Sequence, residues 1–215
     1  MTDPLRASEL SRSYDSFQAL VPTDLTLRSG EIAVLSGPNG AGKSTLLLCL
    51  SGLLHPTTGT ITIDGHDLYT EEKEAKRHLA FVPDVPRFYT ELTAWEHLYF
   101  IALAHQVGDG FEQRKEKLMR EFGLWESRNL YPHNYSRGMR LKLGLLVAFI
   151  RPFKVLLLDE PTSALDVESV DILVQRLKEL RQSGASILLS SHDPNIAEDL
   201  ADRTLRIQNG HVEDT

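Results

Sequence analysis

The sequence predicts an α/β fold in which a mostly parallel sheet has both faces covered. Short apolar runs at 32–35, 155–158 and 186–189 are typical of buried strands, and helical patterns separate them along the chain. A glycine-rich segment, 37–42, lies between the first run and a leucine-rich helix. The length of 215 residues and a hydrophobic content of 41% suit one globular domain with an inserted subdomain.

The first third of the chain predicts strands around one buried helix. Residues 1–30 read as hairpin material, because Leu25 and Leu27 alternate with polar residues. The segment 43–51 is rich in leucine and free of Gly and Pro, which favours a buried helix. Alternation returns at 60–63, so we expect another strand there.

The middle third has a helical texture. Residues 71–78 are charged and helix-like, and 79–82 form a short apolar strand that stops at a proline. A helix is expected over 93–105 with Thr93 as its N-cap, and a charged amphipathic helix over 111–122.

The last third alternates strand and helix. We expect a helix over 136–150, a strand over 154–158, a helix with one apolar face over 170–180, and strands over 186–189 and 204–207. Apolar strands that alternate with helices indicate parallel pairing.

Composition narrows the class of protein. The formal charge of −7 weighs against nucleic-acid binding, so we expect no nucleic-acid partner. A single cysteine, Cys49, suits a reducing compartment and is expected to be an inert core thiol. No signal peptide or membrane-spanning segment is expected, so any membrane association must come through a partner.

The segment after the first buried strand has the pattern of a phosphate-binding loop, G-x-x-x-x-G-K-[ST]. Glycines allow backbone N–H groups to point at phosphates, and the following helix N-terminus adds a positive field. Lys43 is expected to reach the β- and γ-phosphates, and the Ser44 hydroxyl to ligate Mg²⁺. The expected ATP-binding residues here are Gly37, Pro38, Asn39, Gly40, Ala41, Gly42, Lys43, Ser44 and Thr45.

A second signal lies at the carboxyl end of the strand 154–158, where open α/β sheets bind ligands. Asp159 is expected to hold Mg²⁺ directly or through water. Glu160 is then placed to accept a proton from the attacking water.

These motifs and their order resemble the ATP-binding subunits of ABC transporters over nearly the whole chain. Residues 37–45 resemble Walker A, and 159–161 resemble Walker B with its catalytic glutamate. The segment 135–139 stands at the place of the ABC signature, 163–166 resembles the D-loop, and 191–193 resembles the switch histidine region.

The resemblance implies two such domains packed head to tail around two ATP molecules. The signature residues Ser136, Arg137, Gly138 and Met139 are expected to face the ATP held by the partner domain. Asp166 is expected to touch the partner chain, and His192 to contact the γ-phosphate and the attacking water. Tyr14 resembles the aromatic residue that stacks on adenine.

Three positions depart from the family pattern. Arg137 stands where a second glycine is usual, Met139 where glutamine is frequent, and Asp84 where the Q-loop usually has glutamine. Asp84 still offers a hard oxygen to Mg²⁺ or its water. Signatures of the YS[KR]GM kind occur among export-type members, so Arg137 reads as a subfamily mark.

The resemblance implies a P-loop NTPase core with a mostly parallel sheet, an N-terminal antiparallel β subdomain and an inserted helical subdomain. We expect a single ABC ATPase domain over 1–215, with 1–83 and 137–215 as the ATP-binding core and 84–136 as the helical subdomain.

The function implied is that of an ATPase subunit that uses ATP and Mg²⁺, dimerises with itself or a related subunit, and powers a separate membrane-spanning transporter subunit, an exporter. It is expected on the cytoplasmic side, peripheral on the inner face of the cell membrane. Two alternatives are a soluble ABC ATPase acting on DNA or ribosomes, which typically carries tandem ATPase domains or other added modules, and a regulatory nucleotide-binding module with weak hydrolysis.

Overall fold

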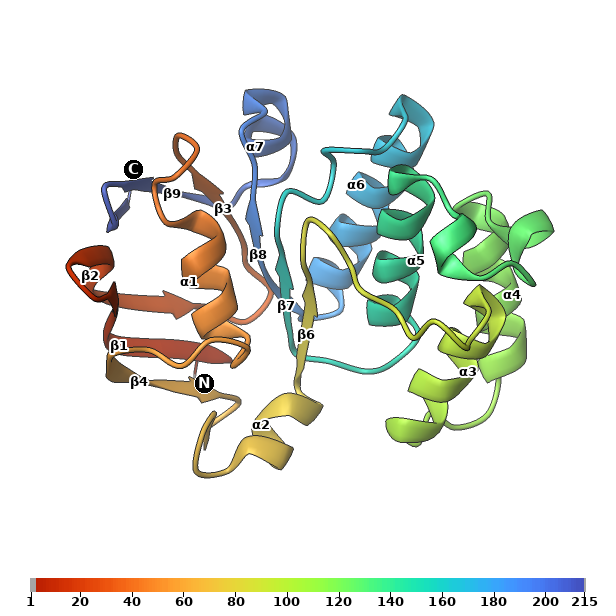
Figure 1. The fold of residues 1–215 in the computed structure, drawn as a ribbon, viewed down its shortest axis with the longest axis horizontal. Coiled ribbons are helices and arrows are strands. Elements are labelled where there is room, and N and C mark those ends of the chain that lie inside the picture. Colours follow the sequence, from red (N-terminus) through yellow and green to blue (C-terminus); the bar gives the residue numbers. More distant parts are fainter. Residues whose placement is uncertain (1–2, 215) are drawn as a thin grey trace. The chain divides into compact units, whose positions relative to one another are not determined.

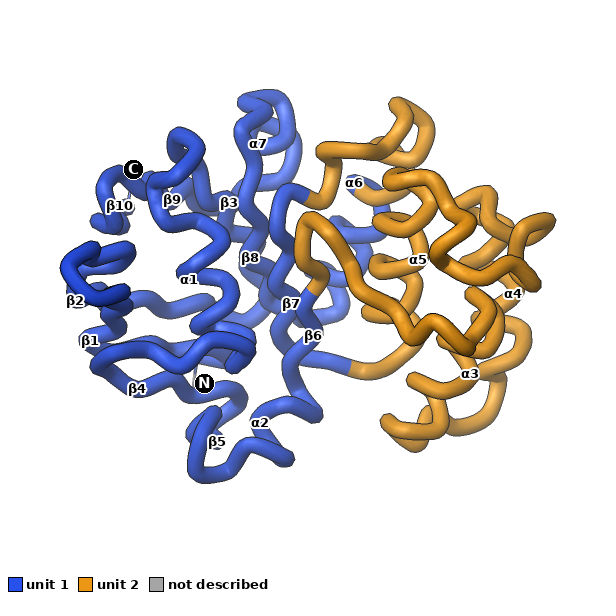
Figure 2. Tube along the Cα trace, in the orientation of Figure 1, with its two compact units in different colours: residues 1–81, 153–160, 174–215 blue, residues 82–152, 161–173 orange. Residues whose placement is uncertain are grey.

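A computed structural model describes residues 3–214. The chain divides into two compact units, shown in different colours in Figure 2. Unit 1 comprises residues 1–81, 153–160 and 174–215, and unit 2 comprises residues 82–152 and 161–173.

Unit 1 contains an antiparallel sheet, and two of its strands form the predicted N-terminal hairpin. The strands are β1 (Leu5–Tyr14), β2 (Phe17–Leu27), β4 (Thr58–Ile63) and β5 (His66–Asp67), in the order β2-β1-β4-β5. The β1 and β2 strands are joined by a tight turn, because Tyr14 pairs with Phe17. The predicted antiparallel β subdomain is therefore present.

The second sheet is mostly parallel and has the order β10-β9-β3-β8-β7-β6. Its strands are β3 (Ile32–Ser36), β6 (Leu79–Val82), β7 (Val155–Leu158), β8 (Ser186–Ser190), β9 (Arg203–Gln208) and β10 (His211–Asp214). The pairs β3–β8, β3–β9 and β7–β8 are parallel, whereas the edge strand β10 is antiparallel to β9. All residues of β7 and β8 are buried, which explains their unbroken apolar sequences.

The hydrophobic core of unit 1 packs both sheets around α1 (Lys43–Leu50), which Figure 1 shows directly after β3. Leu46 and Leu47 of α1 join Leu10 of β1 and Leu35 of β3 in one buried cluster. Cys49 also lies in it, and burial raises the pKa of its thiol to about 11. Such a thiol is protonated at neutral pH, as expected for a core residue.

Two further helices of unit 1 are short. The helix α2 (Glu72–Arg77) lies within the predicted 71–78. The helix α7 (Pro194–Leu200) was not predicted, because seven residues are too few for a clear period. Its start is nevertheless encoded locally, since the Asp193 side chain accepts a hydrogen bond from Asn195 N and Pro194 occupies the first turn.

Unit 2 is helical. It contains α3 (Ala94–Ala104), α4 (Phe111–Glu121), α5 (Arg137–Phe149), the beginning of α6 (Val167–Gln182), and the 3₁₀ turns Trp125–Ser127 and Pro132–Asn134. The predicted cap of α3 is confirmed as a full capping box between Thr93 and Glu96. Unit 2 includes α5 and residues 161–173, whereas the helical subdomain predicted from the sequence spans 84–136. These predicted domain boundaries stay a prediction.

Two glycines lie within α5, where glycine ordinarily weakens a helix. A Cβ on Gly144 would lie 2.7 Å from Cγ of Pro86, and a Cβ on Gly138 would lie 2.5 Å from the backbone oxygen of Ala164. The helix therefore carries glycine where neighbouring segments approach its backbone closely.

Unit 2 also buries a lysine among aromatic rings. Lys115 is 1% exposed, and its Nζ lies 3.5 Å from the ring centroid of Trp95 and 4.7 Å from that of Phe111. The Glu112 carboxylate, 3.0 Å away, supplies the counter-charge. Cation–π attraction and this ion pair together offset the cost of removing the ammonium from water.

Among residues 3–214, no helix combines the length and apolar character needed to cross a bilayer.

Candidate functional site

The phosphate loop connects β3 to α1, as expected. The α1 helix begins directly after Gly42, whose φ of +111° suits glycine. A Cβ on Gly42 would lie 2.8 Å from the oxygen of Ala19, and a Cβ on Gly37 would collide with the oxygen of Ile207. Both glycines are therefore required by conformation and by close packing against β2 and β9.

Lys43, the first residue of α1, turns its ammonium back over this loop. Its Nζ donates to Gly37 O at 2.7 Å and to Pro38 O at 3.4 Å, and lies 3.7 Å from Oε1 of Glu160. The side chain is only 7% exposed. The loop thus holds a largely desolvated cation, which is the charge that a phosphate group requires.

Glu160 follows β7 and meets two other predicted site residues. Its Oε1 faces Lys43, and its Oε2 accepts a hydrogen bond from Nδ1 of His192 at 2.9 Å. The backbone of Glu160 has a φ of +46°, a conformation that costs free energy in any residue with a side chain and that recurs at functional sites. A carboxylate held at this point by an imidazole can act as a general base.

Ser190, at the end of β8, is a site residue that sequence analysis did not predict. Its hydroxyl accepts from Glu160 N at 2.8 Å and donates to Asp159 Oδ1 at 2.7 Å. It is fully buried, so these bonds are protected from water. The only signal in the sequence was a serine two residues before His192. Local patterns could not predict these hydrogen bonds, because they connect positions about thirty residues apart.

Tyr14 lies at the end of β1 with 42% of its surface exposed. The Arg12 guanidinium lies over its ring at 4.4 Å from the centroid, and Arg12 also donates to His55 O. One ring face is therefore covered by a cation, which orients the ring. An exposed aromatic ring so held is suited to stacking on a base.

The predicted magnesium ligands are distributed over both units. Within residues 3–214, no cluster of three or more His, Cys, Asp or Glu side chains is arranged to hold a metal by itself. In unit 1, Ser44 is exposed beside Lys43, and Asp159 is 6% exposed with Oδ1 already bonded to Ser190.

The signature residues lie in unit 2 at the start of α5. Ser136 caps the helix, because its Oγ accepts from Met139 N at 3.1 Å. Arg137 pairs with Asp84 at 2.8 Å, and Gly138 packs against Ala164 O. Asp84 and the signature are thus brought together with one another inside unit 2.

Asp166 lies close to the same helix. Its Oδ2 accepts from Lys142 Nζ at 2.8 Å, and its Oδ1 accepts from the N and Oγ of Ser169. The Lys142 hydrogen bond, followed by those of Ser169, holds the pKa of the Asp166 carboxyl well below its usual range. Asp166 therefore remains ionised, and it is 60% exposed.

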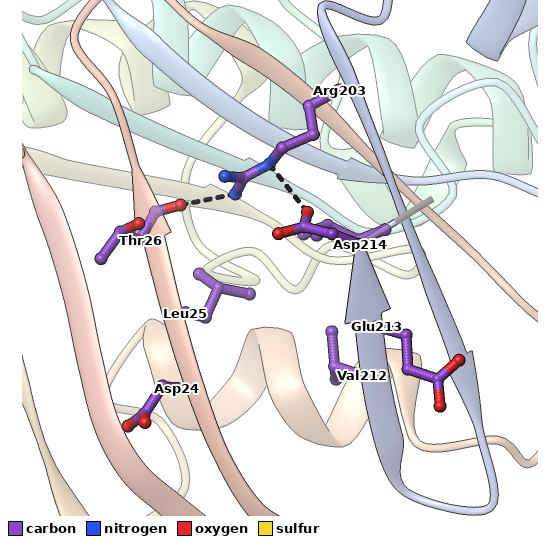
Figure 3. Close-up of a pocket in the computed structure, with 8 residues that line it drawn as sticks. Asp24, Leu25, Thr26, Arg203, Val212, Glu213 and Asp214 are labelled. Atoms are coloured by element: carbon purple, nitrogen blue, oxygen red, sulfur yellow. Dashed lines mark hydrogen bonds and ion pairs between the residues drawn. The ribbon is translucent and has the colours of Figure 1, made fainter.

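A separate pocket in unit 1, drawn in Figure 3, has a volume of about 160 Å³. Arg203 crosses it, donating to Thr26 O at 2.6 Å and pairing with Asp214 at 3.3 Å. Asp24 and Glu213 also line it. None of its lining residues carries a predicted role, so this pocket takes no part in the chemistry below.

The ABC transporter family matches residues 20–163. The ABC-type transporter ATP-binding protein EcsA of Bacillus subtilis (strain 168) is 31% identical over 209 residues, which cover 97% of this chain and 85% of that protein. The SkfA peptide export ATP-binding protein SkfE of the same organism is 33% identical over 212 residues, 97% of this chain and 87% of that protein.

One similar solved structure is a dimeric ATP-binding cassette in a post-hydrolysis state bound to ADP and Pi. It superposes with a TM-score of 0.87 at 25% identity and covers 98% of each chain. Its fold agrees with this α/β architecture, and the two sequence relatives match almost the full chain. This chain belongs to the ABC transporter family, to its ATP-binding proteins.

Proposed function

We propose that this chain is the ATP-binding and ATP-hydrolysing subunit of an exporter, and that it closes as a dimer around two ATP molecules and drives a separate membrane-spanning subunit. One observation carries the proposal most directly. Glu160 lies at the carboxyl end of β7, hydrogen-bonded to His192 and 3.7 Å from the phosphate-loop Lys43. Base, orienting group and phosphate-binding cation therefore share one place in unit 1.

The chain's own residues divide the work. The loop 37–45 binds the phosphates of ATP through backbone N–H groups and Lys43. Glu160 accepts the proton of the attacking water, while His192 holds the carboxylate in position. Tyr14, oriented by Arg12, stacks on the adenine.

Ser44 and Asp159 would hold Mg²⁺, which neutralises the charge that develops on the β- and γ-phosphates. The buried Ser190 hydroxyl donates a hydrogen bond to one oxygen of Asp159 and so orients this carboxylate. Asp84, the third magnesium ligand predicted from the sequence, lies in unit 2.

Ser136, Arg137, Gly138 and Met139 would face the ATP of the partner subunit, with Asp166 at the subunit contact. The transporter role is supported by the relatives, which are ATP-binding proteins of transporters, one of them for peptide export. Dimerisation is supported by the dimeric cassette. These comparisons favour a transporter subunit over a DNA- or ribosome-directed ATPase. Peripheral attachment to the inner face of the membrane through the transporter subunit follows from this role.

The catalytic proposal is tested by Glu160→Gln. The variant should bind ATP normally and lose at least about 100-fold in kcat, because the amide cannot accept the proton. Glu198→Gln, an exposed change on α7 in the same unit, is the matched control and should retain activity. Hydrolysis by Glu160→Gln at the wild-type rate would remove Glu160 from the mechanism.

The transport proposal is tested by capture of the tagged chain from native membranes, followed by mass spectrometry. A stoichiometric multi-span membrane protein is the expected companion. Recovery only with ribosomal or DNA-repair proteins would contradict the transport role and leave the ATPase chemistry intact.

A further inference from the structure

Two of the three departures from the family pattern contact each other. Asp84 stands at the place of the Q-loop glutamine, and Arg137 at the place of the second signature glycine. Arg137 Nη2 donates to Asp84 Oδ1 at 2.8 Å, across 53 positions of sequence. The two unusual residues therefore form one ion pair inside unit 2.

A third residue closes the arrangement. Ser163 Oγ donates to the same Asp84 Oδ1 at 2.8 Å, and Arg137 Nη2 lies 3.3 Å from Ser163 Oγ. One carboxylate oxygen, two residues after the end of β6, thus contacts both the first residue of α5 and the segment that follows Pro161. This oxygen already has two donors, which leaves it poorly suited to a metal ion.

We infer that Asp84 is a positioning residue for the signature: it holds Arg137 and Ser163 and thereby sets the start of α5 against residues 163–166. The inference rests on the proposed function, in which Ser136 and Gly138 at this helix start face the partner's ATP. It assigns Asp84 to an intramolecular ion pair and hydrogen bond in place of the predicted magnesium-ligand role.

Neighbouring contacts point to the same surface of the helix. Gly138 and Lys142 are one turn apart, so they share a helix face. A Cβ on Gly138 would lie 2.5 Å from Ala164 O, and Lys142 pairs with Asp166 at 2.8 Å. Residues 163–166 therefore lie along the first turns of α5, and the Asp84–Arg137 pair fixes the end of that contact nearest the signature serine.

Charge explains why the two departures belong together. With a neutral glutamine at 84, the Arg137 guanidinium would lose its counter-charge. With glycine at 137, the Asp84 carboxylate would lose its cation and keep only the Ser163 hydroxyl. Each departure alone leaves a charge unpaired, whereas both together are neutral and bonded.

The pair acts on orientation more than on stability. The Arg137 side chain is 55% exposed and that of Asp84 35% exposed, and solvent-exposed ion pairs contribute little to global stability. Breaking this pair should therefore leave the melting temperature nearly unchanged while it alters catalysis. A purely structural role would move the melting temperature instead.

The test is a double-mutant cycle on the full chain that restores the usual family residues: Asp84→Gln, Arg137→Gly and the double variant. We expect each single change to lower kcat about tenfold and the double variant to recover to within about threefold of wild type. Asp84→Gln should melt within about 2 °C of wild type, and the two variants with glycine at 137 no more than about 4 °C lower, because glycine weakens a helix. Single effects that simply multiply in the double variant would overturn the inference.

A second arm separates this role from metal binding. The Mg²⁺ concentration for half-maximal ATP-driven dimerisation is measured in the Glu160→Gln background by size-exclusion chromatography. Asp84→Asn and Arg137→Gln should both leave it unchanged. A several-fold higher requirement for Asp84→Asn alone would assign Asp84 to Mg²⁺ and overturn the inference.

A matched control uses the exposed pair Glu72–Lys76 on α2, joined at 2.6 Å. Glu72→Gln, Lys76→Gly and their combination should leave kcat near wild type. Failure of the proposed function is visible separately, because a wild-type chain that neither hydrolyses ATP nor dimerises with it would refute that function, whereas additive effects in an active enzyme refute only the inference.

Discussion

Replacing Gly138 with alanine should damage both the stability and the activity of this protein. The added Cβ would lie 2.5 Å from the backbone oxygen of Ala164, whereas real Cβ atoms essentially never come closer than 3.0 Å to such an atom. The start of α5 and residues 163–166 must therefore separate by at least 0.5 Å, the difference between these distances. The Cβ is attached directly to the helix backbone and its neighbour is a backbone oxygen, so no flexible side chain can absorb the movement.

The magnitude follows from two opposing terms. Alanine is the better helix former by up to about 1 kcal/mol, and overpacking of a closely packed site costs about 1–3 kcal/mol. We expect a net loss of about 1–2 kcal/mol, or a melting temperature lower by about 2–8 °C. Catalysis should suffer more, about tenfold or greater in kcat, because small displacements at a site that orients a phosphate are costly.

Differential scanning fluorimetry and a phosphate-release assay measure these two effects. The matched control is Gly108→Ala, also a glycine of unit 2, where a Cβ meets no atom within 4 Å. That variant should keep full activity and gain slightly in stability. If Gly138→Ala melts at or above the wild-type temperature and keeps its kcat, the close approach of α5 to residue 164 does not exist as described.

Three further outcomes are expected. Lys115→Met should lower the free energy of unfolding by about 1–2 kcal/mol in urea titrations, because it removes the cation from the aromatic rings but keeps the apolar stem; an unchanged midpoint would show that the cation–π contacts contribute nothing. Burial, assisted by Arg151, lowers the pKa of His105 to about 4, so the contribution of His105 to the free energy of unfolding is complete above pH 6.5 and is lost as the pH falls toward 4. His105→Gln should flatten the dependence of stability on pH in that window, and an unaltered curve would contradict the pKa shift. Tyr14→Ala should raise the KM for ATP about tenfold with little change in kcat, whereas Tyr14→Phe should not, and equal KM values for all three proteins would remove Tyr14 from the base-binding role.

Local sequence patterns predicted much of the fold correctly. The segment 79–82 is a strand with the expected bounds, and Thr93 and Ser136 cap helices as the sequence around them indicates. A cap, a turn and a periodic face each depend on residues within about one or two helical turns, so the chain encodes them without reference to distant parts. The short elements α7 and β10 were not expected, because so few residues carry no readable period.

The phosphate loop and the acidic end of β7 were also readable in advance. Each is a contiguous motif whose chemistry is carried by neighbours in sequence, and parallel pairing brings such strand ends to one edge of the sheet. The structure then supplied what these motifs lacked. Ser190, the last residue of β8, joins the backbone of Glu160 to the side chain of Asp159, and these two residues directly follow β7.

The sequence alone therefore determined the family and the nucleotide chemistry, and it predicted the residues that carry this chemistry, because those signals are short and ordered along the chain. Tertiary structure decided which charges pair and which surfaces touch. The Asp84–Arg137–Ser163 contact joins positions 53 and 79 residues apart, and Gly138 is required by an oxygen of a different segment. Such contacts depend on how packed elements approach one another in space, which local propensity and spacing do not encode.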